Sequence, residues 1–145
     1  MTASRHIFTL GIAALVTGCN AMAEYEDVSS DPDQKDLIGH EILTTTALPL
    51  HAVTLTLGSK HIDLCSITQR PGFDGPEVIS RSELPSGTKL RILAVRRCTN
   101  CLSKQGVELI VSSRATAICG QAPVKINRSL LGTSIELVRT GEQRT

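Results

Sequence analysis

Hydrophobic and polar residues alternate with a period of two along most of the chain after residue 36, as in half-buried β-strands. In the stretch 51–57, for example, Val53, Leu55 and Leu57 fall on one face and two threonines on the other. No run has the period of a long amphipathic helix, although residues 129–132 suggest one helical turn. The expected strands cover residues 41–46, 51–57, 60–67, 88–95, 107–111, 114–119, 124–127 and 134–138.

Turn signals rich in glycine and proline separate these segments. They lie at Gly58-Ser59, Pro71-Gly72, Gly75-Pro76, Pro85-Ser86-Gly87, Gly120 and Gly132. The stretch from Leu37 to Thr145 has 109 residues, which is close to the commonest size of a single domain. We therefore predict an all-β fold for residues 37–145, as a single small barrel or sandwich.

The first 18 residues have the three parts of an export signal. Arg5 and His6 give a basic start, residues 7–16 form an apolar run, and small residues precede Cys19. The apolar run has ten residues, whereas a transmembrane helix needs roughly 20. The pattern therefore predicts a cleaved signal peptide over residues 1–18 and not a membrane span.

The stretch Val16-Thr17-Gly18-Cys19 resembles the lipobox of bacterial lipoproteins. This resemblance implies cleavage before Cys19 and acylation of that cysteine with palmitate-type chains, so that lipid would hold the mature chain to a membrane. Asn20 replaces the Asp that commonly retains such lipoproteins at the inner membrane, which favours the periplasmic face of the outer membrane in a two-membrane bacterium. The alternative is simple secretion after cleavage near Ala21-Met22-Ala23.

Residues 19–36 read as the lipidated cysteine followed by an acidic linker. Six acids and one base lie between Asn20 and Asp36, with few branched apolar residues. We expect a flexible, disordered tether, because this composition buries too little surface to offset the entropy of ordering. The stretch after it carries thirteen Lys and Arg against eight Asp and Glu, a net charge of +5. That excess indicates an ordinary mixed surface more readily than one that binds anionic lipid.

Four cysteines fall in the expected domain: Cys65, Cys98, Cys101 and Cys119. An even number in an exported domain predicts disulfides, and three connectivities are possible. We favour Cys98–Cys101, because Thr99-Asn100 suits a tight turn, with Cys65–Cys119 closing a long loop. The C-x-x-C spacing also raises redox and zinc hypotheses. Redox motifs of this spacing begin a helix, and four-cysteine zinc sites usually have two such pairs, so both are disfavoured.

Aromatic residues are scarce, which excludes several ligand classes. Phe8 lies in the signal and Tyr25 in the linker, so Phe73 is the one aromatic residue of the expected domain. A platform on which nucleic-acid bases or sugars stack cannot be built from one ring. The sequence also lacks catalytic, phosphate-binding and metal-ligand motifs. We therefore expect no enzyme activity, no cofactor, no metal and no nucleic-acid partner.

These features predict a membrane-anchored envelope lipoprotein that acts as a non-enzymatic binding or structural module in the periplasm. Its expected partners are the lipid membrane, through acylated Cys19, and an envelope protein. The loop 68–76 is the longest turn-rich segment, and Arg70, Phe73 and Asp74 are its candidate binding residues. The alternative is that Phe73 folds inward and belongs to the core.

Two further resemblances concern residues 83–92. This segment resembles the turn and alternating strand of SH3-like barrels, which implies a small barrel. Ser86-Gly87 also approximates the Ser-Gly-x-x-Tyr loop of the small lysozyme-inhibitor lipoproteins, although Leu90 stands at the Tyr position. The second resemblance implies an alternative function, inhibition of a cell-wall hydrolase.

Overall fold

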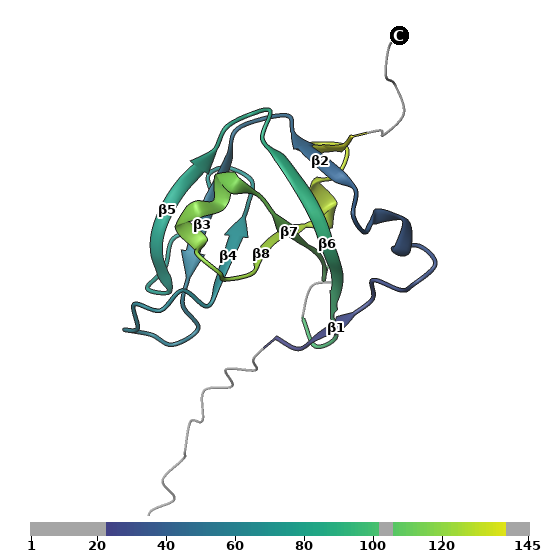
Figure 1. Ribbon diagram of the computed structural model, residues 1–145. Helices are drawn as coiled ribbons and strands as arrows, with labels where there is room; N and C mark the ends of the chain where they lie inside the picture. The colour runs from purple at the N-terminus through teal and green to yellow at the C-terminus, as the bar shows by residue number, and fades with distance from the viewer. Residues whose placement is uncertain (1–22, 102–105, 139–145) are drawn as a thin grey trace, which may run out of the picture.

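The computed structural model describes residues 23–101 and 106–138, so the signal peptide and Cys19 lie outside the described residues. The described residues form an all-β fold, as predicted (Figure 1). Its strands are β1 (Tyr25–Asp27), β2 (Glu41–Thr44), β3 (Leu48–Val53), β4 (Leu64–Ile67), β5 (Val78–Leu84), β6 (Lys89–Cys98), β7 (Val107–Ser112), β8 (Val124–Asn127) and β9 (Ile135–Leu137). Short 3₁₀ helices form at η1 (Lys35–Leu37), η2 (Arg114–Cys119) and η3 (Arg128–Leu130).

All nine strands belong to one sheet, which curls around a single core (Figure 1). The order is β5-β3-β4-β8-β7-β6-β2-β9, and β1 also pairs with β6. Neighbours are antiparallel except β4 and β8, which run parallel. Strands β5 and β9 are the edges of this order. The fold is therefore a barrel-like curled sheet and not two stacked sheets.

The core is aliphatic and follows the alternation of the strands. On β6, Leu90 and Ile92 are 1% and 0% exposed and alternate with exposed residues, and on β7 the buried pair is Leu109 and Val111. Every buried hydrophobic residue in the described part of the chain is aliphatic or cysteine. Side chains of this kind fill a small barrel interior without aromatic rings.

The expectation of a flexible tether is wrong for residues 23–36. Tyr25 lies opposite Cys98 in the pairing of β1 with β6, and Val28 is 2% exposed. The backbone N–H of Val28 donates to the carbonyl of Val95 at 2.9 Å. The prediction from composition was wrong because it ignored backbone pairing. An acidic segment with few apolar side chains can still be ordered when the edge of a neighbouring strand offers it hydrogen bonds.

Some strand predictions were also wrong, and one strand was missed. Residues 114–119 form η2 instead of a strand, because the Ser113 side chain caps the helix by accepting from the N–H of Ala115. Strand β5 was missed, because its central residues are exposed and polar and give no alternating apolar signal. Strand β3 ends at Val53, and the residues after it leave the sheet as a loop.

The favoured disulfide pairing is confirmed by the structure. Cys65 and Cys119 have Cα atoms 5.9 Å apart and join β4 to the end of η2, and both are buried. Cys98 and Cys101 have Cα atoms 5.7 Å apart and close the turn after β6. The first bridge spans 54 residues and the second spans 3, so the first constrains the unfolded chain far more.

Replacing Cys65 by Ser is expected to lower the free energy of unfolding by about 4 kcal/mol, because it opens the long loop. The double variant Cys98→Ser/Cys101→Ser is the control and should lose about 2 kcal/mol, since its loop is short. Denaturant unfolding of both variants under oxidising conditions measures the two values. Equal losses, or four reactive thiols in the native unreduced protein, would contradict this assignment.

Candidate functional site

The loop predicted to carry the binding residues lies across the outer face of β3 and is held there by His51. The His51 side chain is 3% exposed, and its ring centroid is 4.3 Å from that of Phe73. The backbone N–H of Phe73 points at His51 Nε2 at 3.4 Å. Phe73 is half-buried and packs against His51, outside the aliphatic core, so the structure does not place it among the core residues as the alternative interpretation expected.

Gly72 lets the loop approach this closely. Its φ of +86° is in the left-handed region, and a Cβ atom added there would lie 2.6 Å from His51 Nε2. Any side chain at this position would strain the backbone and displace the imidazole. The glycine next to Pro71, read from the sequence as a turn signal, is thus required by the contact between loop and strand.

Two ion pairs flank this contact. Arg70 pairs with Glu83, and Arg81 pairs with Asp74, so each pair joins the loop to β5. Arg70, Arg81 and His51 line a depression of about 570 Å³. Its remaining lining residues are Pro49, Pro71, Ser82 and Glu83. Of the three predicted binding residues, Arg70 lines this depression. Asp74 does not line it but pairs with Arg81, which does. The Phe73 ring packs against His51.

Burial lowers the pKa of His51 below its ordinary value, and the positive charge of Arg81 adds to this effect. The carboxylate of Asp74 acts in the opposite direction but is the weakest of the three causes. His51 Nδ1 is buried and has no hydrogen-bond partner among the described residues. A proton on this ring would therefore place an unneutralised charge beneath the loop.

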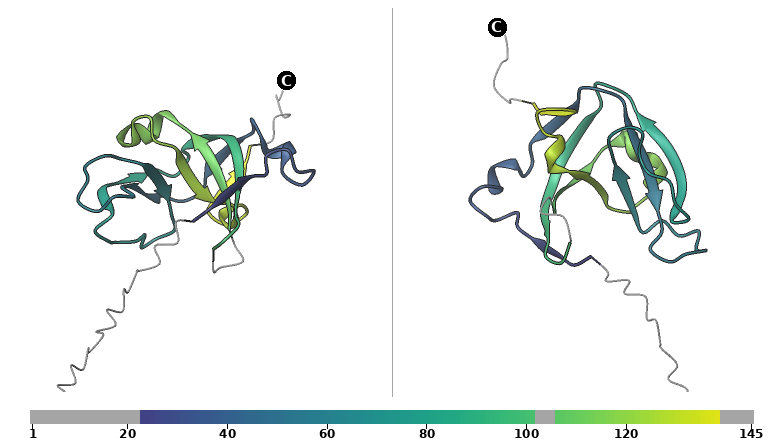
Figure 2. Two further views of the ribbon diagram at one scale, coloured as in Figure 1. Left: turned by 90° about the horizontal axis from the view of Figure 1, so that it is seen from below. Right: turned by 180° about the vertical axis from the view of Figure 1, so that it is seen from behind.

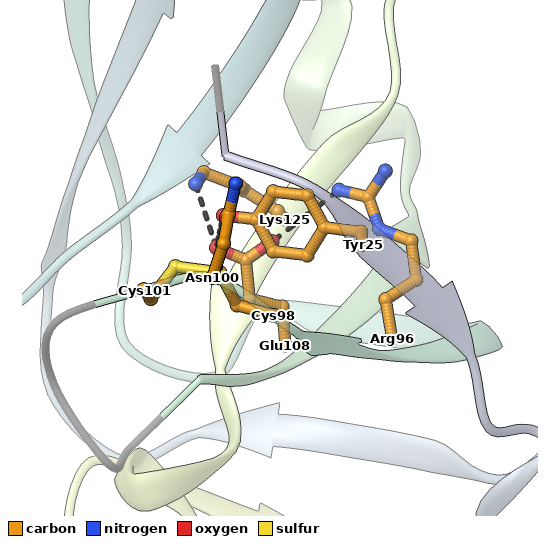
Figure 3. A network of polar contacts seen from close by, with 7 residues as sticks. All are labelled: Tyr25, Arg96, Cys98, Asn100, Cys101, Glu108 and Lys125. Atoms are coloured by element: carbon orange, nitrogen blue, oxygen red, sulfur yellow. Dashed lines mark hydrogen bonds and ion pairs between the residues drawn. A yellow bond between two sulfur atoms is a disulfide. The ribbon is translucent and has the colours of Figure 1, made fainter. Parts of the chain in front are cut away.

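A second polar cluster, which the sequence did not predict, is centred on Glu108 of β7 (Figure 3). The Glu108 side chain is 12% exposed and accepts from Lys125 Nζ at 2.7 Å and from the Tyr25 hydroxyl at 3.1 Å. Arg96 Nη2 lies 3.3 Å from its other oxygen. The Arg96 guanidinium also covers the Tyr25 ring at 4.7 Å, so one carboxylate and one ring unite β1, β6, β7 and β8.

Glu24, the residue before β1, is also tied by hydrogen bonds to the turn that Cys98–Cys101 closes. The Asn100 side-chain oxygen accepts the backbone N–H of Glu24 at 2.8 Å, and the Thr99 N–H donates to the Glu24 carbonyl at 2.9 Å. Figure 3 shows the disulfide beside the Glu108 cluster. The short disulfide thus shapes the turn on which the first described residues rest.

Beside this cluster lies a groove of about 310 Å³ on the outer face of the sheet. Most of its lining residues are polar: Ser66, Thr68, Gln69, Glu108, Lys125, Asn127 and Ser129, with Ile67 and Leu130. The Thr68 hydroxyl is buried without a hydrogen-bond partner in the described part of the chain. The groove offers donors and acceptors to a small polar ligand and is less apolar than typical ligand pockets.

No arrangement of a catalytic nucleophile with its base is formed at these sites. Ser66 lies opposite His51 in the register of β3 and β4, so a hydroxyl and an imidazole are neighbours there. The His51 Nδ1 atom has no partner, however, and Nε2 faces the Phe73 N–H, so neither nitrogen takes the Ser66 proton. Within residues 23–101 and 106–138, no group of three or more His, Cys, Asp or Glu side chains is placed to hold a metal.

The turn at Ser86-Gly87, which resembles the inhibitor loop, makes its contacts within the domain. The Ser86 hydroxyl donates to the carbonyl of Thr45 at 2.9 Å, and Leu90 is 1% exposed in the core. Gly87 has a φ of +81° and leads into the alternating strand β6, as the sequence predicted. Leu90, which stands at the position of the inhibitor's Tyr, is therefore buried in the core.

Comparison with known proteins gives no relative for this chain: no protein family, curated protein or solved structure matches it. In the part of the chain that the structure describes, no helix has the length and apolar character required to cross a membrane.

The free energy of unfolding should fall as the pH drops below about 6.5, because burial depresses the pKa of His51 in the folded state alone. The unfolded chain then takes up the proton first, so the stabilisation is complete above the unfolded pKa and is lost on acidification. Unfolding measured between pH 8 and pH 5 tests this, with His51→Gln expected to flatten the slope. His61→Gln is the control, since it removes an imidazole that is 80% exposed; an unchanged slope in His51→Gln would contradict the assignment.

Glu108→Gln is expected to lower the free energy of unfolding by roughly 1–3 kcal/mol, because two half-buried cations lose their carboxylate. Amide hydrogen exchange of residues 25–28 should accelerate more than that of β7, as β1 loses its Tyr25 contact. Glu136→Gln, an exposed acid on β9, serves as the matched control and should change neither quantity. Unchanged protection of the Val28 amide in Glu108→Gln would show that the cluster does not hold β1.

Proposed function

We propose that this protein is a bacterial envelope lipoprotein, held to the periplasmic face of the outer membrane by acylated Cys19. Its β domain acts as a non-enzymatic binding or structural module for an envelope protein. The observation that carries the proposal is the lipobox-like stretch Val16-Thr17-Gly18-Cys19, which directly precedes a disulfide-braced domain. Disulfides of this kind persist in exported proteins, which agrees with an export signal.

The short distance along the chain between Cys19 and the domain also supports anchoring. Three residues lie between Cys19 and Ala23, where the described chain begins, so these four steps along the chain span at most about 14 Å. An acyl anchor at Cys19 would therefore hold the domain beside the head groups. The module acts at the membrane surface instead of at the end of a long tether.

The proposed surface for the envelope protein is the depression beside the loop 68–76. Arg70 and Arg81 supply cations and Glu83 and Asp74 supply carboxylates, which gives a pattern of alternating charge that a protein surface can complement. Strand β5 is an edge of the sheet next to this depression, and an edge strand can accept a further strand from a partner. The alternative, inhibition of a cell-wall hydrolase, is less well supported. Leu90 stands where the inhibitor loop has its Tyr, and its side chain is buried in the core.

Replacing Cys19 by Ser is expected to remove the acyl chains and to release the protein from, or mislocalise it within, the membrane fraction. The measurement is fractionation of cell envelopes after a high-salt wash, with the mass of the N-terminal peptide of the wild-type chain. Acylation should appear as added mass on a peptide that begins at Cys19.

Two outcomes would count against the proposal. Cys19→Ser protein that still fractionates with washed outer membranes shows that something other than lipid holds it. A wild-type N-terminus at Glu24 without added mass shows simple secretion after cleavage at Ala21-Met22-Ala23. The variant Cys98→Ser/Cys101→Ser is a suitable control, since it removes cysteines but leaves Cys19 in place.

A further inference from the structure

Two leucines are displayed to solvent on the loop between β3 and β4, which we call the leucine loop (residues 54–63). Leu55 is 61% exposed and Leu57 is 70% exposed, the highest values among the large hydrophobic residues described. The sequence pattern placed both on the buried face of a strand, and the structure turns both outward. Single exposed leucines are common on protein surfaces, but two at one loop tip need a reason.

The leucine loop is held in this shape by its own polar side chains. Asp63 Oδ2 accepts the N–H of Leu55 at 2.7 Å and the hydroxyl of Thr54 at 3.2 Å. The same Thr54 oxygen accepts the N–H of Thr56 at 3.2 Å, and the Ser59 hydroxyl accepts the N–H of His61 at 3.0 Å. These hydrogen bonds order the loop, so the exposed leucines belong to a defined structure.

The leucine loop lies at the end of the molecule from which the path to Cys19 departs. Strand β3 runs toward the lower end in Figure 1 and β4 runs away from it, so the loop between them is at that end. Strand β1 begins at the same lower end, and the view from behind in Figure 2 agrees. Strand β9, to which the exposed Leu137 belongs, lies at the opposite end (Figure 1).

Charge at the loop tip fits an anionic lipid surface. Lys60 is exposed and forms no ion pair within the described residues. The one acid of the loop, Asp63, is turned toward the backbone that it holds, and its side chain is 27% exposed. The loop therefore presents apolar side chains and a cation outward, which is the combination found in interfacial membrane contacts.

We infer that the leucine loop is a second membrane contact, in which Leu55 and Leu57 enter the lipid interface beside the head groups that Lys60 meets. This inference rests on the proposed anchor at Cys19, because the short connection to Ala23 brings this end of the domain to the bilayer. The acyl chains hold the protein to the membrane, and the leucines fix which way the domain faces. The depression beside the loop 68–76 is then presented to partners in one orientation.

A fluorescent probe on the loop tests the inference in the full-length lipidated protein. Leu57→Cys supplies one free thiol, since the native cysteines are two disulfide pairs and acylated Cys19. The labelled protein is reconstituted in vesicles of phosphatidylethanolamine and phosphatidylglycerol that carry a lipid-attached quencher. Leu137→Cys is the matched control, an exposed leucine at the opposite end. Intact mass of the same samples reports acylation.

The expected result is a blue shift of the probe at position 57 and loss of its emission to the lipid quencher, with neither change at position 137. Acylated protein whose probe at 57 stays water-like overturns the leucine contact and leaves the anchor standing. A blue shift at 57 without quenching means that a protein, or a second copy of this chain, covers the loop, which also overturns the inference. Absence of acyl mass is a failure of the proposed function itself.

Discussion

The pairing of β1 with β6 fixes the first described residues to the rest of the domain. Backbone pairing of Tyr25 with Cys98, burial of Val28, and the bond from the Tyr25 hydroxyl to Glu108 together incorporate the first described residues into the sheet. Without these contacts the acidic segment would be a linker and the domain could take any position relative to an anchor. With them, only the few residues between Cys19 and Ala23 would separate the proposed anchor from folded structure. Strand β1, the leucine loop and the surface beside residues 68–76 therefore belong to one folded domain, and the proposed anchor would join that domain directly at β1.

The sequence predicted the features that depend on local alternation and on cysteine number. Strand β6 follows the period of two, with Leu90 and Ile92 buried. The turn between Cys98 and Cys101 predicted one disulfide, and the two remaining cysteines form the other. Strand β5 escaped prediction because an edge strand with exposed polar residues has no apolar period. Leu55 and Leu57 were misplaced because their alternation matched a strand, whereas the bonds from Thr54 and Asp63 form a loop instead.

The candidate sites were predictable to a smaller extent, since they depend on contacts between distant residues. Arg70 was found because the loop is long and rich in turns, and it does line the depression. His51 and Glu108 were missed because each lies in an ordinary strand and gains its character from neighbours far along the chain. Glu108 lies opposite Arg96 on β6 and opposite Asn127 on β8, with Lys125 two residues before Asn127. The register that brings these residues together cannot be read from one strand alone.

The most direct test of the account is neutron reflectometry of the lipidated full-length protein on a supported bilayer. We predict domain density that begins within about 14 Å of the head groups, the longest reach of the connection from Cys19 to Ala23. A flexible tether over residues 19–36 would allow a hydrated layer of up to about 60 Å. Density directly at the head groups supports a domain docked on the membrane through β1 and the leucine loop. A thick hydrated layer between bilayer and domain would contradict it.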